Sequence, residues 1–320
     1  MSHSPVTDER LAELTDKLEN GIKELYASGR YAEYLAAMSK FHQYSFGNAL
    51  LILLQCPAAS QVAGYGAWKK LGSHVKQYES GIKILATCPY RKRVEQERKD
   101  PATGQILCGP DGQPLRETCY VSATYFKVVT VFDISQTEGR ELPRIGVSEL
   151  VGEVADFPMF YARLAELSPL PVEQGPVPGT AKGYTSFIEG RIVLRPGMSQ
   201  AQTIKTLVHE IAHAMLHDPS QVSDGEPRQR REKEVEAESV AYVVCQHFGL
   251  DTADYSFGYV AGWSRGRELA ELKASLDRIH SAAGEIINTI QPPEKQITQE
   301  YDPQEQARRH SRRHTGKRKK

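Results

Sequence analysis

The sequence predicts an α+β protein with two domains. Three observations support this fold class: apolar residues recur at helical spacing near both ends of the chain, short alternating runs typical of strands lie between them, and 320 residues exceed the length of one ordinary domain. The composition, 40% hydrophobic and 25% charged, is that of a globular protein. The longest apolar run, residues 49–54, is far shorter than the ~18 residues that span a bilayer, so no membrane partner is expected.

The first domain is expected to begin with helices and continue with strands. Apolar residues at helical spacing predict helices over 8–25, 30–41 and 48–55. Alternating or apolar runs between turn residues predict strands at 75–78, 81–87 and 120–132. Residues 100–116 are rich in glycine and proline and have no periodicity, so we expect a loop or a hairpin tip there.

A second run of helices and strands follows, and we place the domain boundary near residue 140. Helices are expected over 151–167, 199–217, 230–248 and 266–290, with short strands at 183–187 and 191–194. The helix 199–217 has the clearest start, because Ser199 and Gln202 form a capping-box pattern. The domains are therefore 1–140 and 141–292, and the polar, charged residues 293–320 are expected to be a disordered tail.

Charge is segregated along the chain although the formal net charge is zero. Residues 293–320 contain nine Lys or Arg against four acidic residues, and residues 64–99 contain nine against three. Such segments are typical of binding to an anionic partner, and a solvated face with a soluble tail is the alternative.

The cysteines indicate a reducing compartment. Five cysteines are scattered without a C-x-x-C pair, which argues against a disulfide framework and against a thiolate zinc site. The first twenty residues lack a basic start followed by an apolar core, so they do not resemble a secretory signal. We expect a cytoplasmic protein.

The strongest functional signal is the pattern H-E-x-x-H at residues 209–213, inside the predicted helix 199–217. Four residues on a helix bring His209 and His213 to one face, where both imidazoles can bind one tetrahedral Zn²⁺. Glu210 would then act as the general base, taking a proton from the attacking water and returning it to the leaving amine. The alternative is a surface helix with two unrelated histidines.

A hydrolytic zinc site needs a third protein ligand. His217 continues the four-residue series but lies about 12 Å along the helix from His209, so we expect it to interact with the carbonyl end of the helix dipole instead. The next helix offers carboxylates. Glu236 shares a stripe with apolar residues and can point inward, and Glu234 and Glu238 are the alternatives.

Residues 209–213 together with the segment Val235-Glu236-Ala237-Glu238-Ser239-Val240-Ala241 resemble the gluzincin-type metallopeptidases of the ImmA/IrrE group. The resemblance runs from about residue 151 to residue 263. It implies a zincin-like fold for the second domain, zinc-dependent peptidase activity, and Glu236 as the third metal ligand beside His209 and His213.

Residues 8–137 resemble the single-stranded-DNA-binding domain of ArdC antirestriction proteins, through segments such as Ala63-Gly64-Tyr65 and Val131-Phe132-Asp133-Ile134-Ser135-Gln136-Thr137. Tyr78 departs from the family, which usually has glycine in that turn. The resemblance and the aromatic and basic character of this domain suggest contacts of bases with rings and of phosphates with lysines. The expected DNA-binding residues are Tyr44, Asn48, Tyr65, Trp68, Lys69, Lys70, Lys76 and Lys83.

Together these observations predict a zinc metalloendopeptidase coupled to single-stranded-DNA binding, with a role in antirestriction or in processing proteins near the DNA of mobile elements. Its partners would be single-stranded DNA and a protein substrate lying extended along strand 183–187 or strand 191–194. Two alternatives remain. One is a non-catalytic antirestriction factor that coats DNA and uses zinc structurally, and the other is a regulatory protease that cuts a specific repressor.

Overall fold

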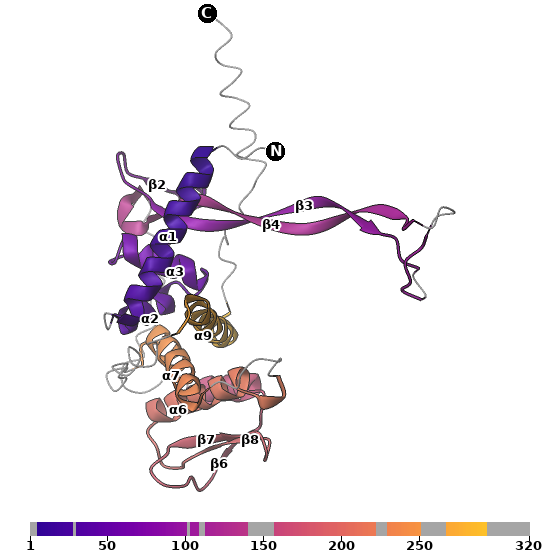
Figure 1. The fold of residues 1–320 in the computed structure, drawn as a ribbon. Helices are drawn as coiled ribbons and strands as arrows, with labels where there is room; N and C mark the ends of the chain where they lie inside the picture. Colours follow the sequence, from indigo (N-terminus) through magenta and orange to yellow (C-terminus); the bar gives the residue numbers. More distant parts are fainter. Residues whose placement is uncertain are drawn as a thin grey trace, which may run out of the picture.

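The computed structural model describes residues 5–27, 30–100, 103–108, 113–139, 157–221, 229–250 and 267–292. It is a mixed helix and sheet structure, as the sequence predicts (Figure 1). In this part of the chain no helix is both long enough and apolar enough to cross a membrane. The expected boundary near residue 140 and the basic tail 293–320 lie outside the described residues.

Three helices open the chain where the sequence predicts them: α1 (Pro5–Ala27), α2 (Tyr31–Lys40) and α3 (Phe46–Gln55). The start of α3 is set by Ser45, whose side chain accepts a hydrogen bond from the backbone of Asn48 and so satisfies one of the free amides of the first turn. The apolar faces of these helices form a core in which Ile22, Tyr34 and Leu51 are fully buried.

Strands and a short helix follow: β1 (Val62–Gly64), α4 (Tyr65–Lys70), β2 (Ser73–Val75), β3 (Ile82–Glu97), β4 (Arg116–Asp133), a 3-10 turn (Ile134–Gln136) and β5 (Thr137–Gly139). The sheet order is β1-β4-β3, and β2 pairs with β5. Beyond the helices, β3 and β4 continue as a two-stranded ribbon that projects from the body (Figure 1). The expected strand 75–78 is wrong beyond Val75, because residues 77 and 78 form a turn in which Tyr78 has a φ of 68°.

Two side-chain amides of α3 form hydrogen bonds with backbone N–H and C=O groups along the edge of β3. The side chain of Asn48 donates to Leu85 O at 2.8 Å and accepts from Leu85 N at 2.9 Å. Gln55 makes the same pair of bonds with Lys83, at 2.8 and 3.0 Å. Since β3 is an edge strand, these side chains replace the missing neighbouring strand over this stretch.

The second half contains α5 (Phe157–Leu167), β6 (Val172–Gln174), β7 (Gly183–Ser186), β8 (Arg191–Leu194), α6 (Gln200–Leu216), a 3-10 turn (Pro219–Gln221), α7 (Arg230–His247) and α9 (Leu269–Ile290). The sheet order is β6-β8-β7, so β8 is the central strand and β7 lies at an edge. Pro158 fits in α5 because it stands in the first turn, where its missing N–H costs no hydrogen bond. Strand β6 was not expected from the sequence.

The two halves share one hydrophobic core. Helix α2 packs on α7, and the Tyr31 and Ser239 hydroxyls lie 3.0 Å apart at this contact. Helix α9 packs against α7 and also against α1 and α3 (Figure 1), and its Lys273 donates to Glu19 of α1 at 2.8 Å. The α6–α7 pair, which carries the H-E-x-x-H histidines, is thereby held against the first half of the chain.

Candidate metal centre and nucleic-acid interface

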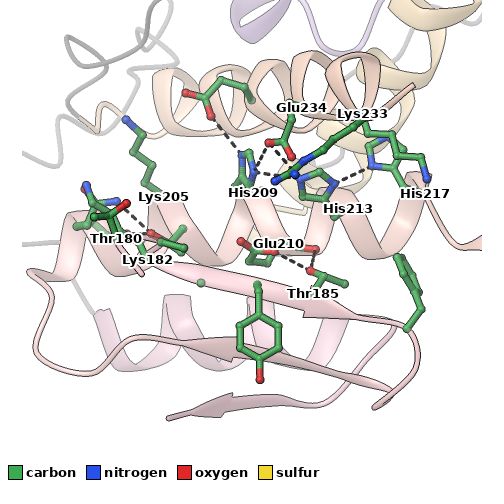
Figure 2. A pocket seen from close by; sticks show the side chains of 18 residues that line it. Thr180, Lys182, Thr185, Lys205, His209, Glu210, His213, His217, Lys233 and Glu234 are labelled. Carbon is green, nitrogen blue, oxygen red and sulfur yellow. Dashed lines mark hydrogen bonds and ion pairs between the residues drawn. The ribbon is translucent and has the colours of Figure 1, made fainter. Parts of the chain in front are cut away.

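The two histidines of the H-E-x-x-H pattern face each other on α6. Ser199 caps this helix as expected, accepting a hydrogen bond from the backbone of Gln202. One turn of helix separates His209 from His213, and their Nε2 atoms lie 3.1 Å apart (Figure 2). The opposite side of α6 is buried through Leu207 and Ile211, which fixes the direction in which both imidazoles point.

Glu234 of α7 completes this group. Its Oε2 lies 3.6 Å from Nε2 of His209 and 3.8 Å from Nε2 of His213. Ligands about 2.0–2.1 Å from a tetrahedral Zn²⁺ lie about 3.3 Å from one another, so these three atoms are spaced as ligands of one ion. Among the described residues, His209, His213 and Glu234 form the one group of at least three potential ligands whose donor atoms all lie within 4.8 Å of each other.

Glu236, the ligand expected from the sequence, lies elsewhere. Its carboxylate is fully buried on another side of α7, where it accepts hydrogen bonds from Arg278 of α9 and lies 3.1 Å from Nε2 of His217. The structure therefore does not bring Glu236 to His209 and His213. The physical reason is helix periodicity. Side chains two positions apart on an α-helix point in directions that differ by about 200°, so Glu234 and Glu236 cannot share a face.

The other ring nitrogens of both histidines also have partners. Nδ1 of His209 lies 3.2 Å from Glu238, and Nδ1 of His213 lies 2.9 Å from Nδ1 of His217. His217 is buried and continues to Glu236 and Arg278, which gives a chain of polar contacts from α6 through α7 to α9. The sequence predicted that His217 interacts with the helix dipole and did not predict these polar contacts. The four-residue spacing of residues 209, 213 and 217 could have indicated them.

These contacts shift several pKa values. Burial disfavours a charge on His209, but hydrogen bonds with Glu234 and Glu238 outweigh it and raise its pKa to about 9. Hydrogen bonds with both histidines lower the pKa of Glu234 well below its usual range. Burial raises the pKa of Glu236, but hydrogen bonds with His217 and Arg278 outweigh this effect and lower the pKa to about 2. The carboxylates of Glu234 and Glu236 are therefore ionised at neutral pH, which suits them to bind cations or N–H donors.

Glu210 points toward β7, on the side of the cleft that faces Thr185 (Figure 2). Its Oε2 lies 2.8 Å from the Thr185 hydroxyl, which also lies 3.0 Å from the backbone oxygen of Glu210. A Cβ added to Gly183 would lie 3.2 Å from Cγ of Glu210, so glycine allows β7 to approach the helix. Thr185 was missed by the sequence reasoning, which placed it in a strand without a role.

An open cleft of about 700 Å³ joins these residues. Residues 180–185 and Phe187 line one side of the cleft. Side chains from Gln202 to His217, on α6 and just after it, line the second side, and α7 contributes Arg230, Lys233, Glu234 and Glu238. The three candidate metal ligands and Glu210 all lie at this one cleft.

Three of the residues expected to bind DNA are engaged within the fold. Trp68 is 2% exposed and donates from Nε1 to Phe132 O at 2.9 Å, and both amide atoms of Asn48 bond to β3. The Tyr44 hydroxyl donates to Val62 O at 2.7 Å. Trp68 and Asn48 are thus buried, with their polar side-chain groups bonded to backbone atoms, and their expected contacts with DNA stay a prediction.

The other expected residues are exposed. Helix α4 carries Tyr65, whose exposed fraction is 50%, together with Lys69 and Lys70. Lys76 follows β2, and Lys83 lies on β3. Lys76 donates to Ser135 O and Lys83 donates to the Thr130 hydroxyl. Tyr78, in the turn after β2, is 93% exposed. Since α4 packs against β2, we refer to Tyr65, Lys69, Lys70, Lys76 and Tyr78 as the α4–β2 surface.

Family models match both halves of the chain. The model described as the N-terminal domain of the anti-restriction factor ArdC matches residues 4–132, and a peptidase-type model described as an IrrE N-terminal-like domain matches residues 169–246. The first part of the chain is thus similar to an ArdC N-terminal domain, and the second part is similar to an IrrE-like domain. The candidate metal ligands of this ArdC-like chain lie within the second match, and the α4–β2 surface lies within the first.

Individual relatives of the ArdC-like chain are distant. An uncharacterized protein of Bacillus anthracis, pXO2-81, is 28% identical over 330 residues, which cover 94% of this chain and 55% of the relative, so the chain spans about half the length of the curated relative. The metal-free crystal structure of antirestriction protein ArdC from the R388 plasmid is 21% identical, with a TM-score of 0.47 over 76% of this chain and 84% of that one. Its Mn(II)-bound structure is 19% identical, with a TM-score of 0.46 over 77% and 83%.

Proposed function

We propose that this ArdC-like chain is a zinc-dependent endopeptidase that acts on proteins beside single-stranded DNA and serves antirestriction. The observation that carries the proposal is the convergence of two imidazole nitrogens and a carboxylate oxygen in an open cleft that also holds Glu210. Two nitrogens and one oxygen are the donor set of the catalytic zinc in several peptidases, in which the fourth position is open to water or substrate.

The donor set fits a divalent cation on its own chemistry. Two imidazole Nε2 atoms 3.1 Å apart, with an ionised carboxylate beside them, are stable together only when a cation or a proton lies between them. Imidazole ligands favour zinc over manganese, which prefers oxygen. The proposed ligands are therefore His209, His213 and Glu234, with Zn²⁺ as the metal.

The polar chain behind His213 fixes where its proton lies. The ionised Glu236, held by Arg278, can only accept, so Nε2 of His217 donates to it. Nδ1 of His217 is then an acceptor for the Nδ1 proton of His213, which leaves the Nε2 lone pair of His213 directed at Glu234 and His209. Glu238 does the same for His209 by accepting its Nδ1 proton.

The chain's own residues then divide the work of peptide hydrolysis. When bound, a zinc ion supplies Lewis-acid polarisation of a carbonyl and lowers the pKa of water. Glu210 accepts the proton of the attacking water and returns it to the leaving amine, and Thr185 orients the Glu210 carboxylate by donating to Oε2. The edge strand β7 offers backbone groups for an extended substrate, whereas the central strand β8 is already paired with a strand on each side.

The DNA-binding half of the proposal is supported by the ArdC-type match and by the α4–β2 surface. Exposed rings can stack on bases without sequence preference, and lysines neutralise phosphates. Lys69→Ala or Lys70→Ala should each reduce the dependence of log K on log salt by about one, because each variant removes one phosphate contact.

The decisive experiment measures cleavage of unfolded protein by the full chain loaded with zinc, with manganese as the comparison metal, in the presence and absence of single-stranded DNA. Glu210→Gln is the matched control, since it keeps the size of the side chain and removes the base, and we expect it to reduce cleavage at least ~100-fold. Cleavage that persists in this variant contradicts the mechanism. A chain that binds zinc and DNA but cleaves nothing is a non-catalytic DNA-coating factor instead.

A second experiment tests the ligand set. Glu234→Gln should abolish stoichiometric zinc binding in equilibrium dialysis, because it removes a ligand oxygen charge without changing shape. Glu236→Gln should retain zinc while lowering the free energy of unfolding by ~1–3 kcal/mol, because it removes one of the two buried carboxylates that pair with Arg278, Glu232 being the other. Loss of zinc in Glu236→Gln with retention in Glu234→Gln would restore the assignment made from the sequence.

A further inference from the structure

The β3–β4 ribbon extends well beyond the helices of the first half. Helices α1 and α3 pack at its inner end, where Val131 is buried, and the two strands project past them (Figure 1). We call the projecting part, residues 87–97 paired with residues 116–126, the outer ribbon. Most of its side chains are exposed, including Tyr120 at 68% and Phe126 at 53%. Exposed rings on a projecting element are typical of an interaction surface.

The strand register sorts these side chains onto two faces. Residues paired across an antiparallel ladder point to the same side, and successive residues along a strand alternate between the two sides. Four pairs on one side run from Thr87–Phe126, nearest the body, to Arg93–Tyr120, and Arg91 belongs to the third of these pairs. We call this side the arginine face. The pairs between them form the other side of the ribbon.

The charge of the arginine face is positive. Over its four pairs it carries the Arg91 and Arg93 guanidinium groups and no carboxylate, and Glu95 follows one pair further out. Among the described residues, Arg91 has no hydrogen bond or ion pair, and Arg93 donates to the neutral hydroxyl of Thr118 at 3.3 Å. Because no carboxylate in this part of the chain neutralises either guanidinium, the face is complementary to an anionic partner.

The shape of the arginine face fits the major groove of duplex DNA. Paired strands lie about 4.8 Å apart, and the B-form major groove, about 12 Å wide, admits a two-stranded ribbon. The four pairs extend over about 20 Å, which is the length of about six base pairs. The side chains of Ser122 and Thr124 are short, so the strands can approach the base edges closely. Arginine can donate two parallel hydrogen bonds to a guanine edge or to a phosphate.

We infer that the arginine face of the outer ribbon binds duplex DNA in the major groove. This inference goes beyond the single-strand binding proposed for the α4–β2 surface and does not depend on it. A single strand fits the face less well, because Tyr120 and Phe126 lie six residues apart on β4, about 20 Å, and successive bases cannot stack on rings so widely separated. A protein partner is expected on the other side of the ribbon, where Tyr90 and Tyr125 pack edge to face at 5.8 Å.

The test compares a short fluorescent duplex of mixed sequence with a fluorescent oligothymidylate, by anisotropy with the full chain over a range of salt concentrations. Arg91→Gln and Arg93→Gln should each weaken duplex binding by about threefold or more at low salt and reduce the dependence of log K on log salt by about one. Lys92→Gln is the matched control, since Lys92 stands between the two arginines and points to the other face. It removes the same charge and should leave duplex binding nearly unchanged. Residues 293–320 are present in every variant and contribute equally.

The groove is identified with dimethyl sulfate, which methylates guanine N7 in the major groove and adenine N3 in the minor groove. We expect a saturating amount of the wild-type chain to protect N7 and to leave N3 accessible. Protection of N3 alone overturns the inference, as does the absence of duplex binding.

The variants supply the other decisive outcomes. The inference is wrong if the arginine variants bind the duplex as well as the wild type, or if Lys92→Gln weakens binding as much as they do. It is also wrong if the arginine variants lose oligothymidylate binding to the same extent, because the face would then bind any polyphosphate chain. Duplex binding that depends on Arg91 and Arg93, in a chain that does not bind oligothymidylate, supports the inference and rejects the single-strand proposal alone.

Discussion

The cleft and the α4–β2 surface differ in how closely the fold specifies their side chains. In the cleft, Nδ1 of each imidazole has a partner, which is His217 for His213 and Glu238 for His209, and the contacts of His217 continue to the buried Glu236 and to Arg278. On the α4–β2 surface, Tyr65 and Lys69 project into solvent from a helix of six residues. Exact placement is needed for chemistry at one atom, while binding a flexible polyanion requires only charge and flat surfaces.

The largest expected effect distinguishes residues that stabilise the first half of the chain from residues that we propose bind DNA. Trp68→Ala should lower the free energy of unfolding by ~3–5 kcal/mol in urea denaturation, since it removes a buried ring and leaves Phe132 O without its donor. Tyr65→Ala is the exposed control: we expect a stability change within ~0.5 kcal/mol and DNA binding weaker by ~1–3 kcal/mol. Full stability in Trp68→Ala together with weakened DNA binding would return Trp68 to the DNA interface.

The second prediction concerns the polar chain behind the metal centre. His217→Leu should weaken zinc affinity ~10–100-fold in competition with a chelating dye, because His213 loses the acceptor that fixes its proton on Nδ1. His217→Gln, whose amide can accept from His213 and donate to Glu236, should recover part of that loss. If both variants bind zinc as tightly as the wild type, the chain has no orienting role.

A third, smaller effect is expected at Tyr78. A non-glycine residue at a φ of 68° costs roughly 1–2 kcal/mol, and the turn is held in place because Gln136 donates to Glu79 and to Ser80 O. Tyr78→Gly should therefore raise the free energy of unfolding by ~1 kcal/mol, after its greater chain entropy is offset, while weakening DNA binding through the loss of an exposed ring. Tyr78→Ala controls for the ring, since it keeps the strain. A stability loss in the glycine variant would contradict the strain argument.

A further effect is a dependence of stability on pH that lies outside both sites. Burial, helped by the neighbouring His247 and His280, lowers the pKa of His42 to about 4 from its usual 6.5. The unfolded chain therefore binds more protons between pH 6.5 and 4, so this group's contribution to stability is complete above pH 6.5 and is lost as the pH falls toward 4. Urea denaturation across this range should show a shallower loss for His42→Gln than for the wild type, and parallel curves would rule His42 out.

Local patterns predicted most of the fold and part of the site. The period of the apolar residues places α1, α6 and α7 well, and H-E-x-x-H fixes its own geometry because both histidines belong to one helix. The third ligand depends on how α7 is rotated against α6. Apolar neighbours correctly predict that Glu236 is buried, but its partner is Arg278, 42 residues later on α9, which no local pattern shows. Trp68 illustrates the same limit, since the sequence cannot distinguish a buried ring from an exposed one.

Helix α9 also determines when the chain can fold during synthesis. The Lys273–Glu19 contact spans 254 residues, and α9 covers apolar faces of α1 and α3 that form early in translation. At a synthesis rate of about 5–20 residues per second, the interval between the first half and α9 lasts on the order of ten seconds or more. During that time the nascent chain presents an uncovered apolar surface, which is a binding site for chaperones and a starting point for aggregation.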